Sequence, residues 1–368
     1  MKVKAAVVRE AGGNFDIAEL DLDDPRDDEI LVRVKGVGLC HTDLIARDGM
    51  MPFAPPAVLG HEGSGIVERV GAKVRKVKPG DAVGITFRSC GVCPRCKRGD
   101  PAYCHTMPQL NYAGMRPDGS KALHENGADV VSNFFGQSSF ATYALAYERN
   151  VVKLPDDVPV ELMGPLGCGI QTGAGGIMRS LACEKGSTLL VLGGGAVGLS
   201  AVMGAVVQEC GTIIVVEPYA QRRKLAKELG ATHTIDPKAS TDLAAAVREI
   251  VPIGVDYAFD TTGIPAVLQA TMGCLGPHGV FGIVGVPPPG TPVPGDLLSV
   301  ITFGHAVKGI IEGDSDPDTF IPEMIALYKA GRFPFDRLIR TYPMSEINKA
   351  IADQHQGDCV KVVLLPDA

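Results

Sequence analysis

The sequence predicts an α/β protein that combines a β-rich part with a doubly wound parallel sheet. Three observations support this prediction. Short β-branched runs separated by Gly, Pro and Asp fill the first 150 residues. From about Pro165, buried strand-like runs alternate with helical segments, which indicates a parallel sheet with right-handed crossovers. The strand-like run Val360–Leu364 near the C-terminus has the same residue pattern as the first 150 residues. We therefore expect the parallel-sheet part to be inserted into the β-rich part.

Each element of the two parts has its own local signal. In the β-rich part, β-branched runs bounded by turn residues predict strands at Lys4–Val8, Ile30–Val37, Gly65–Val70, Ala82–Ile85 and Val151–Leu154. In the parallel part, apolar runs predict strands at Thr188–Leu192, Ile213–Glu217, Thr232–Ile235, Val255–Phe259, Val280–Val284 and Ala306–Ile311. The intervening segments predict helices. The first follows the glycine-rich turn and ends at Gln208, and the others span Ala220–Leu229, Thr241–Ile250, Pro265–Cys274 and Pro317–Ala330.

The composition excludes several classes of protein. The chain has 368 residues, 45% of them hydrophobic and 21% charged, which is typical of about two globular domains. A formal charge of −7 disfavours a nucleic acid or an anionic membrane as partner, and the absence of Trp disfavours a base-stacking surface. The N-terminus lacks the apolar run of a secretory signal. We therefore expect a cytoplasmic protein without nucleic-acid or membrane partners.

Four of the ten cysteines form the pattern C-x2-C-x2-C-x7-C, at Cys90, Cys93, Cys96 and Cys104. Four thiolates at this spacing favour a closed, tetrahedral structural zinc site. The alternative is an iron–sulfur cluster, but there the fourth cysteine follows after three residues and precedes Pro. In this chain His105 follows instead. A DNA-contacting zinc ribbon is also disfavoured, because the few nearby cations stand in an acidic chain.

A second set of metal ligands is scattered along the chain. Cys40 precedes His41, Thr42 and Asp43, whereas His61-Glu62 and Cys168 lie further on. Two thiolates and one imidazole with an open position are the ligand set of a catalytic zinc that acts on alcohols. Asp43 suits the free ring nitrogen of His61. Taken singly, each residue has an ordinary structural role, and the spacing alone leaves open whether the three ligands meet.

A glycine-rich turn predicts a dinucleotide site. Gly193, Gly195 and Gly198 fit G-x-G-x-x-G between a predicted strand and a helix, and Glu217 closes the next strand nineteen residues later. The pyrophosphate would lie at the helix N-terminus, and Glu217 would bind the ribose hydroxyls and repel the additional phosphate of NADP. NAD is therefore the predicted cofactor. Arg222 and Arg223 either weaken that preference or form a solvated helix face.

Together these features resemble the zinc-dependent alcohol dehydrogenases of the medium-chain dehydrogenase/reductase superfamily, over essentially the whole chain. The stretch Gly60-His61-Glu62-x2-Gly65-x5-Gly71-x2-Val74 matches that family's zinc signature. The resemblance implies a GroES-like catalytic zinc domain of residues 1–169 and 313–368 and a Rossmann NAD-binding domain of residues 170–312. It implies one catalytic and one structural zinc per subunit, and homodimers or homotetramers.

The resemblance also implies a role for individual residues. Cys40, His61 and Cys168 would bind the catalytic zinc, and the four clustered cysteines the structural zinc. The remaining roles concern substrate and cofactor: Glu62 as a carboxylate that can approach the zinc, Thr42 as proton acceptor, His41 and Lys361 at the cofactor pyrophosphate, and Thr172 and Val286 near the nicotinamide. One position departs from the pattern: Ile45 stands where some members have the histidine that ends the proton relay.

Two segments narrow the substrate. Residues 133–144 and 312–336 resemble bacterial aryl-alcohol (benzyl alcohol) dehydrogenases and, similarly, oxidisers of geraniol and perillyl alcohol. We therefore expect reversible oxidation of a primary aromatic or allylic alcohol to its aldehyde. An S-(hydroxymethyl)glutathione dehydrogenase is an alternative that requires a cationic pocket, for which Arg88 and Arg116 are candidates. A zinc-free quinone reductase and a non-catalytic NAD-binding module are more distant alternatives.

Overall fold

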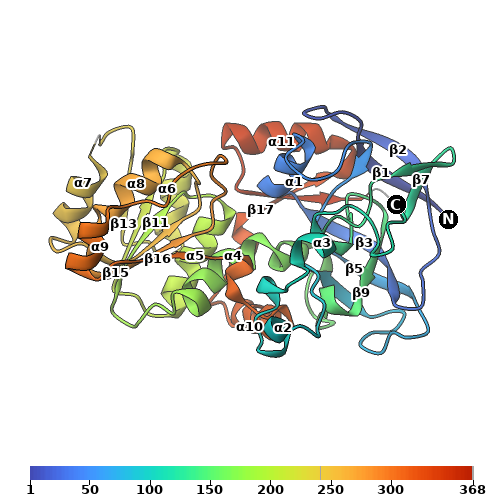
Figure 1. The fold of residues 1–368 in the computed structure, drawn as a ribbon, viewed down its shortest axis with the longest axis horizontal. Helices are drawn as coiled ribbons and strands as arrows, with labels where there is room; N and C mark the ends of the chain where they lie inside the picture. Colours follow the sequence, from blue (N-terminus) through green and yellow to red (C-terminus); the bar gives the residue numbers. More distant parts are fainter. Residues whose placement is uncertain (241, 367–368) are drawn as a thin grey trace. The chain divides into compact units, whose positions relative to one another are not determined.

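The computed structural model describes residues 1–240 and 242–366, which form two compact units (Figure 1). The first unit contains Met1–Cys168, Asp316–Glu323 and the chain from Asp336 onward, and the second contains Gly169–Ser315 and Met324–Phe335. Gly169 and residues 313–315 and 324–335 thus lie in the second unit, although the resemblance grouped them with the first. Helix α10 (Pro317–Lys329) contributes residues to both units.

Two mainly antiparallel sheets build the first unit. The smaller has the order β4-β1-β2-β7-β8, and the larger has the order β10-β6-β5-β3-β18-β17, with β9 also paired to β3. These strands are β1 (Lys2–Val8), β2 (Phe15–Leu22), β3 (Glu29–Gly38), β4 (Ala57–Val58), β5 (Glu62–Val70), β6 (Ala82–Ile85), β7 (Leu123–Glu125), β8 (Ala128–Val130), β9 (Tyr143–Tyr147), β10 (Val151–Lys153), β17 (Ile339–Pro343) and β18 (Lys361–Leu365).

The five strands that the sequence predicted in the first unit are all present. Strand β2 was not predicted, because its apolar residues are interspersed with Asp and Glu that face outward from the sheet. Strand β18 pairs antiparallel with β3, which explains why the C-terminal run has the texture of the N-terminal part. The helices of this unit are short: α1 (His41–Arg47), α2 (Pro94–Lys97), α3 (Met107–Asn111) and α11 (Ile347–Gln356).

The second unit is built on a parallel sheet of order β13-β12-β11-β14-β15-β16. This order confirms the doubly wound sheet that the sequence predicted. The strands are β11 (Thr188–Leu192), β12 (Thr212–Val216), β13 (His233–Ile235), β14 (Val255–Asp260), β15 (Leu275–Ile283) and β16 (Ala306–Gly309). The helices are α4 (Gly169–Gly175), α5 (Ala196–Val207), α6 (Ala220–Glu228), α7 (Leu243–Ile250), α8 (Pro265–Met272) and α9 (Leu297–Phe303).

Most predicted boundaries in this unit differ from the observed ones by three residues or fewer. Helix α7 begins at Leu243, where the Asp242 side chain caps the helix by accepting from the N–H of Ala245; its predicted start, Thr241, lies outside the described residues. Strand β15 begins five residues earlier than predicted, since its first part contains Gly and Pro. Within the described ranges, no helix is both long and apolar enough to cross a membrane.

Candidate metal and cofactor sites

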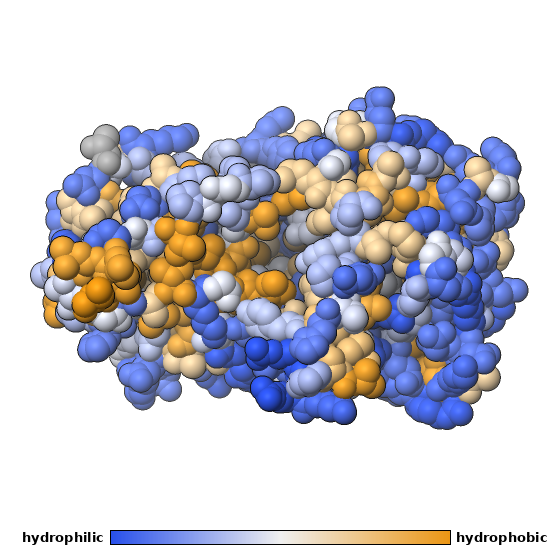
Figure 2. Space-filling view, in the orientation of Figure 1, coloured by the Kyte–Doolittle hydropathy of each residue, from blue (hydrophilic) through white to orange (hydrophobic). Residues whose placement is uncertain are grey.

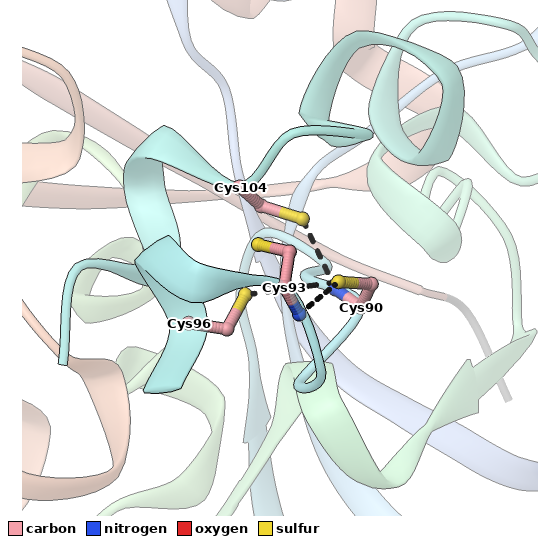
Figure 3. A group of neighbouring side chains, drawn as sticks. All are labelled: Cys90, Cys93, Cys96 and Cys104. Atoms are coloured by element: carbon pink, nitrogen blue, oxygen red, sulfur yellow. Dashed lines mark hydrogen bonds between the residues drawn. The ribbon is translucent and has the colours of Figure 1, made fainter. Parts of the chain in front are cut away.

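The four clustered cysteines meet in one lobe of the first unit. Figure 3 shows their side chains directed toward one another, and the four sulfur atoms all lie within 4.8 Å of one another. Cys93 occupies the N-cap position of α2 (Pro94–Lys97), Cys96 lies within this helix, and Cys104 follows a short 3₁₀ turn. The backbone N–H of Cys90 donates to Sγ of Cys104 at 3.2 Å, and that of Cys93 to Sγ of Cys90 at 3.3 Å. This closed set of four sulfurs suits a structural zinc.

The backbone also favours the thiolate form of Cys93, whereas burial raises the pKa of Cys96 to about 12. The N–H groups of Cys96 and His105 point at the Cys93 sulfur and lower the pKa of that thiol to about 6. Thiolate, not thiol, is the form that binds a metal. The local fold therefore prepares at least this ligand for metal binding.

The second ligand set converges as well. The donor atoms of Cys40, His61, Glu62 and Cys168 lie within 4.8 Å of one another, and Nε2 of His61 is 3.3 Å from Sγ of Cys168. Cys40 caps α1 directly after β3, His61 and Glu62 open β5, and Cys168 ends the first unit. Two sulfurs, one imidazole nitrogen and one carboxylate fit a zinc ion with three firm ligands and a further position.

Asp43 organises two of these ligands. Its Oδ1 lies 2.8 Å from Nδ1 of His61 and also accepts from the backbone N–H of Gly60, while Oδ2 accepts from the backbone N–H of Cys40. Because a carboxylate only accepts, Nδ1 of His61 carries the proton and the Nε2 lone pair is available for a metal. Both side chains are fully buried. The sequence predicted the contact with His61 but not the two backbone contacts.

Glu62 and Lys361 form a buried ion pair beside these ligands. Nζ of Lys361 lies 2.5 Å from Oε2 of Glu62 and donates to the backbone carbonyl of Leu39 at 3.1 Å. Burial raises the pKa of Glu62 to about 7, although the Lys361 ammonium opposes that shift. The resemblance assigned Lys361 to the cofactor pyrophosphate; the structure places its ammonium on Glu62.

The thiol of Cys40 is more acidic than an ordinary cysteine thiol. Its hydrogen bond with Cys168 lowers the pKa of Cys40, and the nearby His61 ring acts in the same direction. Thr42, in the first turn of α1, has its Oγ1 3.8 Å from Sγ of Cys40, so its hydroxyl lies beside the ligand set. His41 begins the same helix and is exposed.

Aromatic rings surround the other side of His61. Phe135 stacks on the imidazole with ring centroids 4.4 Å apart and planes at 26°, and Phe134 meets it edge-on at 5.5 Å. Phe53 and Tyr112 contact these two rings in turn. The sequence flagged residues 133–144 only as a substrate-branch motif, so this contact with the imidazole was not predicted.

The glycine-rich turn of the second unit has the shape of a dinucleotide cradle. Gly193 has φ +98° and leads from β11 into α5, and a Cβ there would come within 2.4 Å of Oγ1 of Thr261. A Cβ on Gly198 would lie 1.9 Å from the Gly193 carbonyl oxygen, whereas a Cβ on Gly195 would meet nothing within 4 Å. The first and last glycines are thus required for packing, and the middle one leaves the backbone open to a pyrophosphate.

Glu217 is fixed beside this turn. It is 3% exposed, and its carboxylate accepts from the backbone N–H of Gly194 at 2.7 Å and of Tyr219 at 2.9 Å. The Arg223 guanidinium donates to the carbonyls of Glu217 and Pro218 and pairs with Asp236, so it is already engaged within the unit.

Arg222, Thr172 and Val286, which were also predicted near the cofactor, lie in the second unit. The guanidinium carbon of Arg222 lies 5.0 Å from the centre of the Tyr219 ring. Thr172 belongs to α4, and Val286 is 62% exposed in the segment after β15.

Arg88 and Arg116, the candidate cations of the glutathione alternative, lie in different surroundings. The Arg116 guanidinium is buried, where it binds both carboxylate oxygens of Glu29 and also pairs with Asp23. The guanidinium carbon of Arg88 lies 3.3 Å from the centre of the Tyr147 ring. Arg116 is thus engaged in a buried ion pair with Glu29, whereas Arg88 lines a pocket together with Lys73 and Arg149.

Comparison with known proteins identifies the family. Residues 26–156 match the family model described as alcohol dehydrogenase GroES-like domain, and residues 196–330 match zinc-binding dehydrogenase. The geraniol dehydrogenase of Castellaniella defragrans is 48% identical over 99% of this chain and 98% of its own length. The chain therefore belongs to the zinc-dependent alcohol dehydrogenases of the medium-chain dehydrogenase/reductase superfamily, as the sequence predicted.

Two solved structures resemble the whole chain. An alcohol dehydrogenase zinc-binding domain protein from Burkholderia ambifaria is 49% identical, with a TM-score of 0.97. The benzyl alcohol dehydrogenase of Acinetobacter calcoaceticus is 43% identical, with a TM-score of 0.96. In both comparisons all of each chain is covered. The chain is thus an NAD- and zinc-dependent alcohol dehydrogenase with a GroES-like domain and a Rossmann domain.

The cysteine lobe yields a first prediction. Cys93→Ala should remove one of two zinc ions per chain and lower the melting temperature by about 5 °C or more, because structural zinc contributes folding free energy directly. Metal analysis and calorimetry measure both quantities. Cys359→Ala, a buried cysteine outside both ligand sets, is the matched control. Lost turnover with unchanged melting and two bound zinc ions would contradict the structural role.

Proposed function

We propose that the enzyme oxidises primary aromatic or allylic alcohols of the benzyl alcohol type to their aldehydes with NAD, reversibly. The observation that carries this proposal is the ligand set of Cys40, His61 and Cys168 in a chain that is 43% identical to a benzyl alcohol dehydrogenase over its whole length. A zinc ligand set of this kind acts on alcohols, and the name of that relative supplies the substrate class.

A terpene alcohol is the second candidate. It is supported by the 48% identity with a geraniol dehydrogenase, while the 43% identity with a benzyl alcohol dehydrogenase supports the aromatic one. Both substrates carry the hydroxyl on a carbon next to a π-system. That neighbour stabilises the partial positive charge which develops at the carbon as the hydride leaves.

The proposed mechanism assigns a task to each residue of the chain. When bound, zinc would supply Lewis-acid chemistry that eases loss of the alcohol proton, and NAD would supply the hydride acceptor. Cys40, His61 and Cys168 would hold the metal, and Asp43 places the proton of the neutral His61 ring on Nδ1, so that Nε2 would face the metal. The Thr42 hydroxyl, beside Cys40, accepts the alcohol proton. Because the Ile45 side chain has no group that can accept or donate a proton, the proton leaves Thr42 through water or His41.

The substrate class is tested by initial rates of NADH formation with benzyl alcohol, geraniol, ethanol and S-(hydroxymethyl)glutathione. We expect benzyl alcohol or geraniol to exceed ethanol in kcat/KM by about tenfold or more, the scale of a well-filled apolar pocket. A preference for ethanol or for the glutathione adduct would contradict the proposal. The ratio of the first two substrates decides between the aromatic and the terpene alternatives.

Thr42→Ala should lower kcat by about 100-fold, because it removes the group that accepts the alcohol proton. Thr42→Ser, which keeps the hydroxyl, is the matched control and should retain most of the activity. Steady-state kinetics with saturating NAD measures both variants. Equal kcat values in the alanine variant and the parent would exclude Thr42 from proton transfer.

Glu217→Ala should shift the NAD:NADP ratio of kcat/KM toward NADP by about tenfold or more, since a fixed carboxylate repels the additional phosphate. Glu249→Ala removes an exposed carboxylate from α7 of the same unit and serves as control. Should the ratio stay constant in Glu217→Ala, another group selects the cofactor.

We also propose that the enzyme forms a homodimer, or a homotetramer built from such dimers, through the second unit. Strand β16 lies at one end of the sheet. The segment that precedes it in the chain, which includes α9, carries five exposed apolar side chains: Val293, Leu297, Leu298, Ile301 and Phe303. Figure 2 shows hydrophobic side chains gathered over α9. An apolar patch next to a sheet edge is a typical interface between copies of one chain.

Ile301→Glu should therefore shift the protein toward the monomer, because it places a charge in an apolar contact. Light scattering after size-exclusion chromatography measures the mass. Glu249→Lys changes an exposed charge on α7 and should leave the mass unchanged. An Ile301→Glu variant with the oligomeric mass of the parent would contradict this interface.

A further inference from the structure

The loop before strand β9 has an unusual backbone for its residue types. Asn133, Phe135 and Ser138 all have positive φ, at +60°, +52° and +55°. For a bulky aromatic residue such as Phe135 the left-handed region is sterically unfavourable. A conformation of this kind persists only where surrounding contacts enforce it, and it often marks a functional site.

Hydrogen bonds from the rest of the first unit enforce this conformation. Nδ2 of Asn150 donates to the carbonyls of Phe135 and Gly136, each at 3.1 Å. Oγ of Ser138 accepts from the backbone N–H of Phe134 at 3.0 Å and donates to the carbonyl of Val58 at 2.7 Å. The loop is therefore held at several points, on both sides of Phe135.

The same loop runs along the segment that contains His61. Nε2 of Gln137 donates to the His61 carbonyl at 2.8 Å, and its Oε1 accepts from the Gly63 N–H at 3.0 Å. The N–H of Ser139 donates to the Gly60 carbonyl at 2.8 Å. These contacts fix the backbone of the histidine relative to the backbone of Phe135.

The ring of the histidine needs a further constraint. The bond to Cβ and the hydrogen bond from Nδ1 to Asp43 hold the imidazole at two adjacent atoms of one edge, and Nε2 lies on the other side of the ring. A flat ring stacked at 4.4 Å limits tilting of that side, and the edge of Phe134 limits movement at right angles. The direction of the Nε2 lone pair then depends on the face of Phe135.

We propose that Phe135 is a positioning residue for the catalytic metal: its strained backbone places the phenyl ring on His61 and so sets the plane of the imidazole ligand. A core residue that only filled space would be replaceable by a leucine of similar size. A positioning residue is not replaceable in this way, because its flat face is required. The inference rests on the proposed function only through His61 as a metal ligand and is independent of the alcohol oxidised.

The test measures how firmly the catalytic zinc is held, and not the rate of alcohol oxidation. The zinc-loaded enzyme is exposed to a chelator together with a thiol-alkylating reagent, and peptide mass spectrometry follows the labelling of Cys40 and Cys168 over time. Labelling of the four lobe cysteines is the internal control. Phe135→Leu removes the flat ring, whereas Phe135→Gly removes the ring and also accepts positive φ without strain. Phe15→Leu, a buried ring of the same core that contacts Phe140, is the matched control.

We expect both Phe135 variants to label Cys40 and Cys168 about tenfold faster or more, the usual cost of losing a group that orients a metal-bound histidine. The lobe cysteines and Phe15→Leu should behave as the parent does. Replacing the zinc by cobalt should also shift the visible absorption of the catalytic site in both variants. Parent-like labelling in Phe135→Leu or in Phe135→Gly, with an unchanged cobalt spectrum, would overturn the proposal. That result would leave the proposed substrate class untouched.

Discussion

The buried carboxylate of Asp43 is the interaction on which the catalytic site depends. One side chain accepts from the backbone of Cys40, from the backbone of Gly60 and from the ring of His61. It thereby ties the start of α1 to the start of β5 and, in the same contact, selects the tautomer that leaves Nε2 available. A buried carboxylate is costly unless its oxygens are paired, and here donors reach both of them. Replacing it would disturb the position of two ligands and the protonation of one.

Around that carboxylate, the site combines a rigid frame with groups of matched charge. Thiolates and carboxylate bring negative charge into a buried place, and Lys361 supplies a compensating ammonium beside Glu62. Such an arrangement favours a divalent cation, because the cation balances charge that water does not reach. The aromatic rings complete the other side of His61 and keep it apolar. The metal ligands and the rings around His61 thus belong to one set of neighbouring contacts.

The parts that could be predicted from the sequence are those with a local signal. The four lobe cysteines lie within fifteen residues, and the glycine-rich turn lies between a strand and a helix, so spacing alone defined both. The parallel sheet followed from alternating strands and helices. Cys168 is different: it lies 107 residues from His61, and only the fold brings the two together. The resemblance to a family supplied that ligand, and the structure shows the convergence.

Other contacts had no signal in the sequence. The pairing of Lys361 with Glu62 requires β18 to reach the larger sheet next to β3, which no local pattern reveals. The stacking of Phe135 depends on a left-handed backbone that Phe rarely adopts, so residue type argued against it.

The most direct test of the account is an anomalous difference map of crystals at the zinc absorption edge. We expect two peaks per chain, one in the cysteine lobe and one bonded to Cys40, His61 and Cys168. A single peak in the lobe, with fully active enzyme, would contradict the zinc-dependent mechanism.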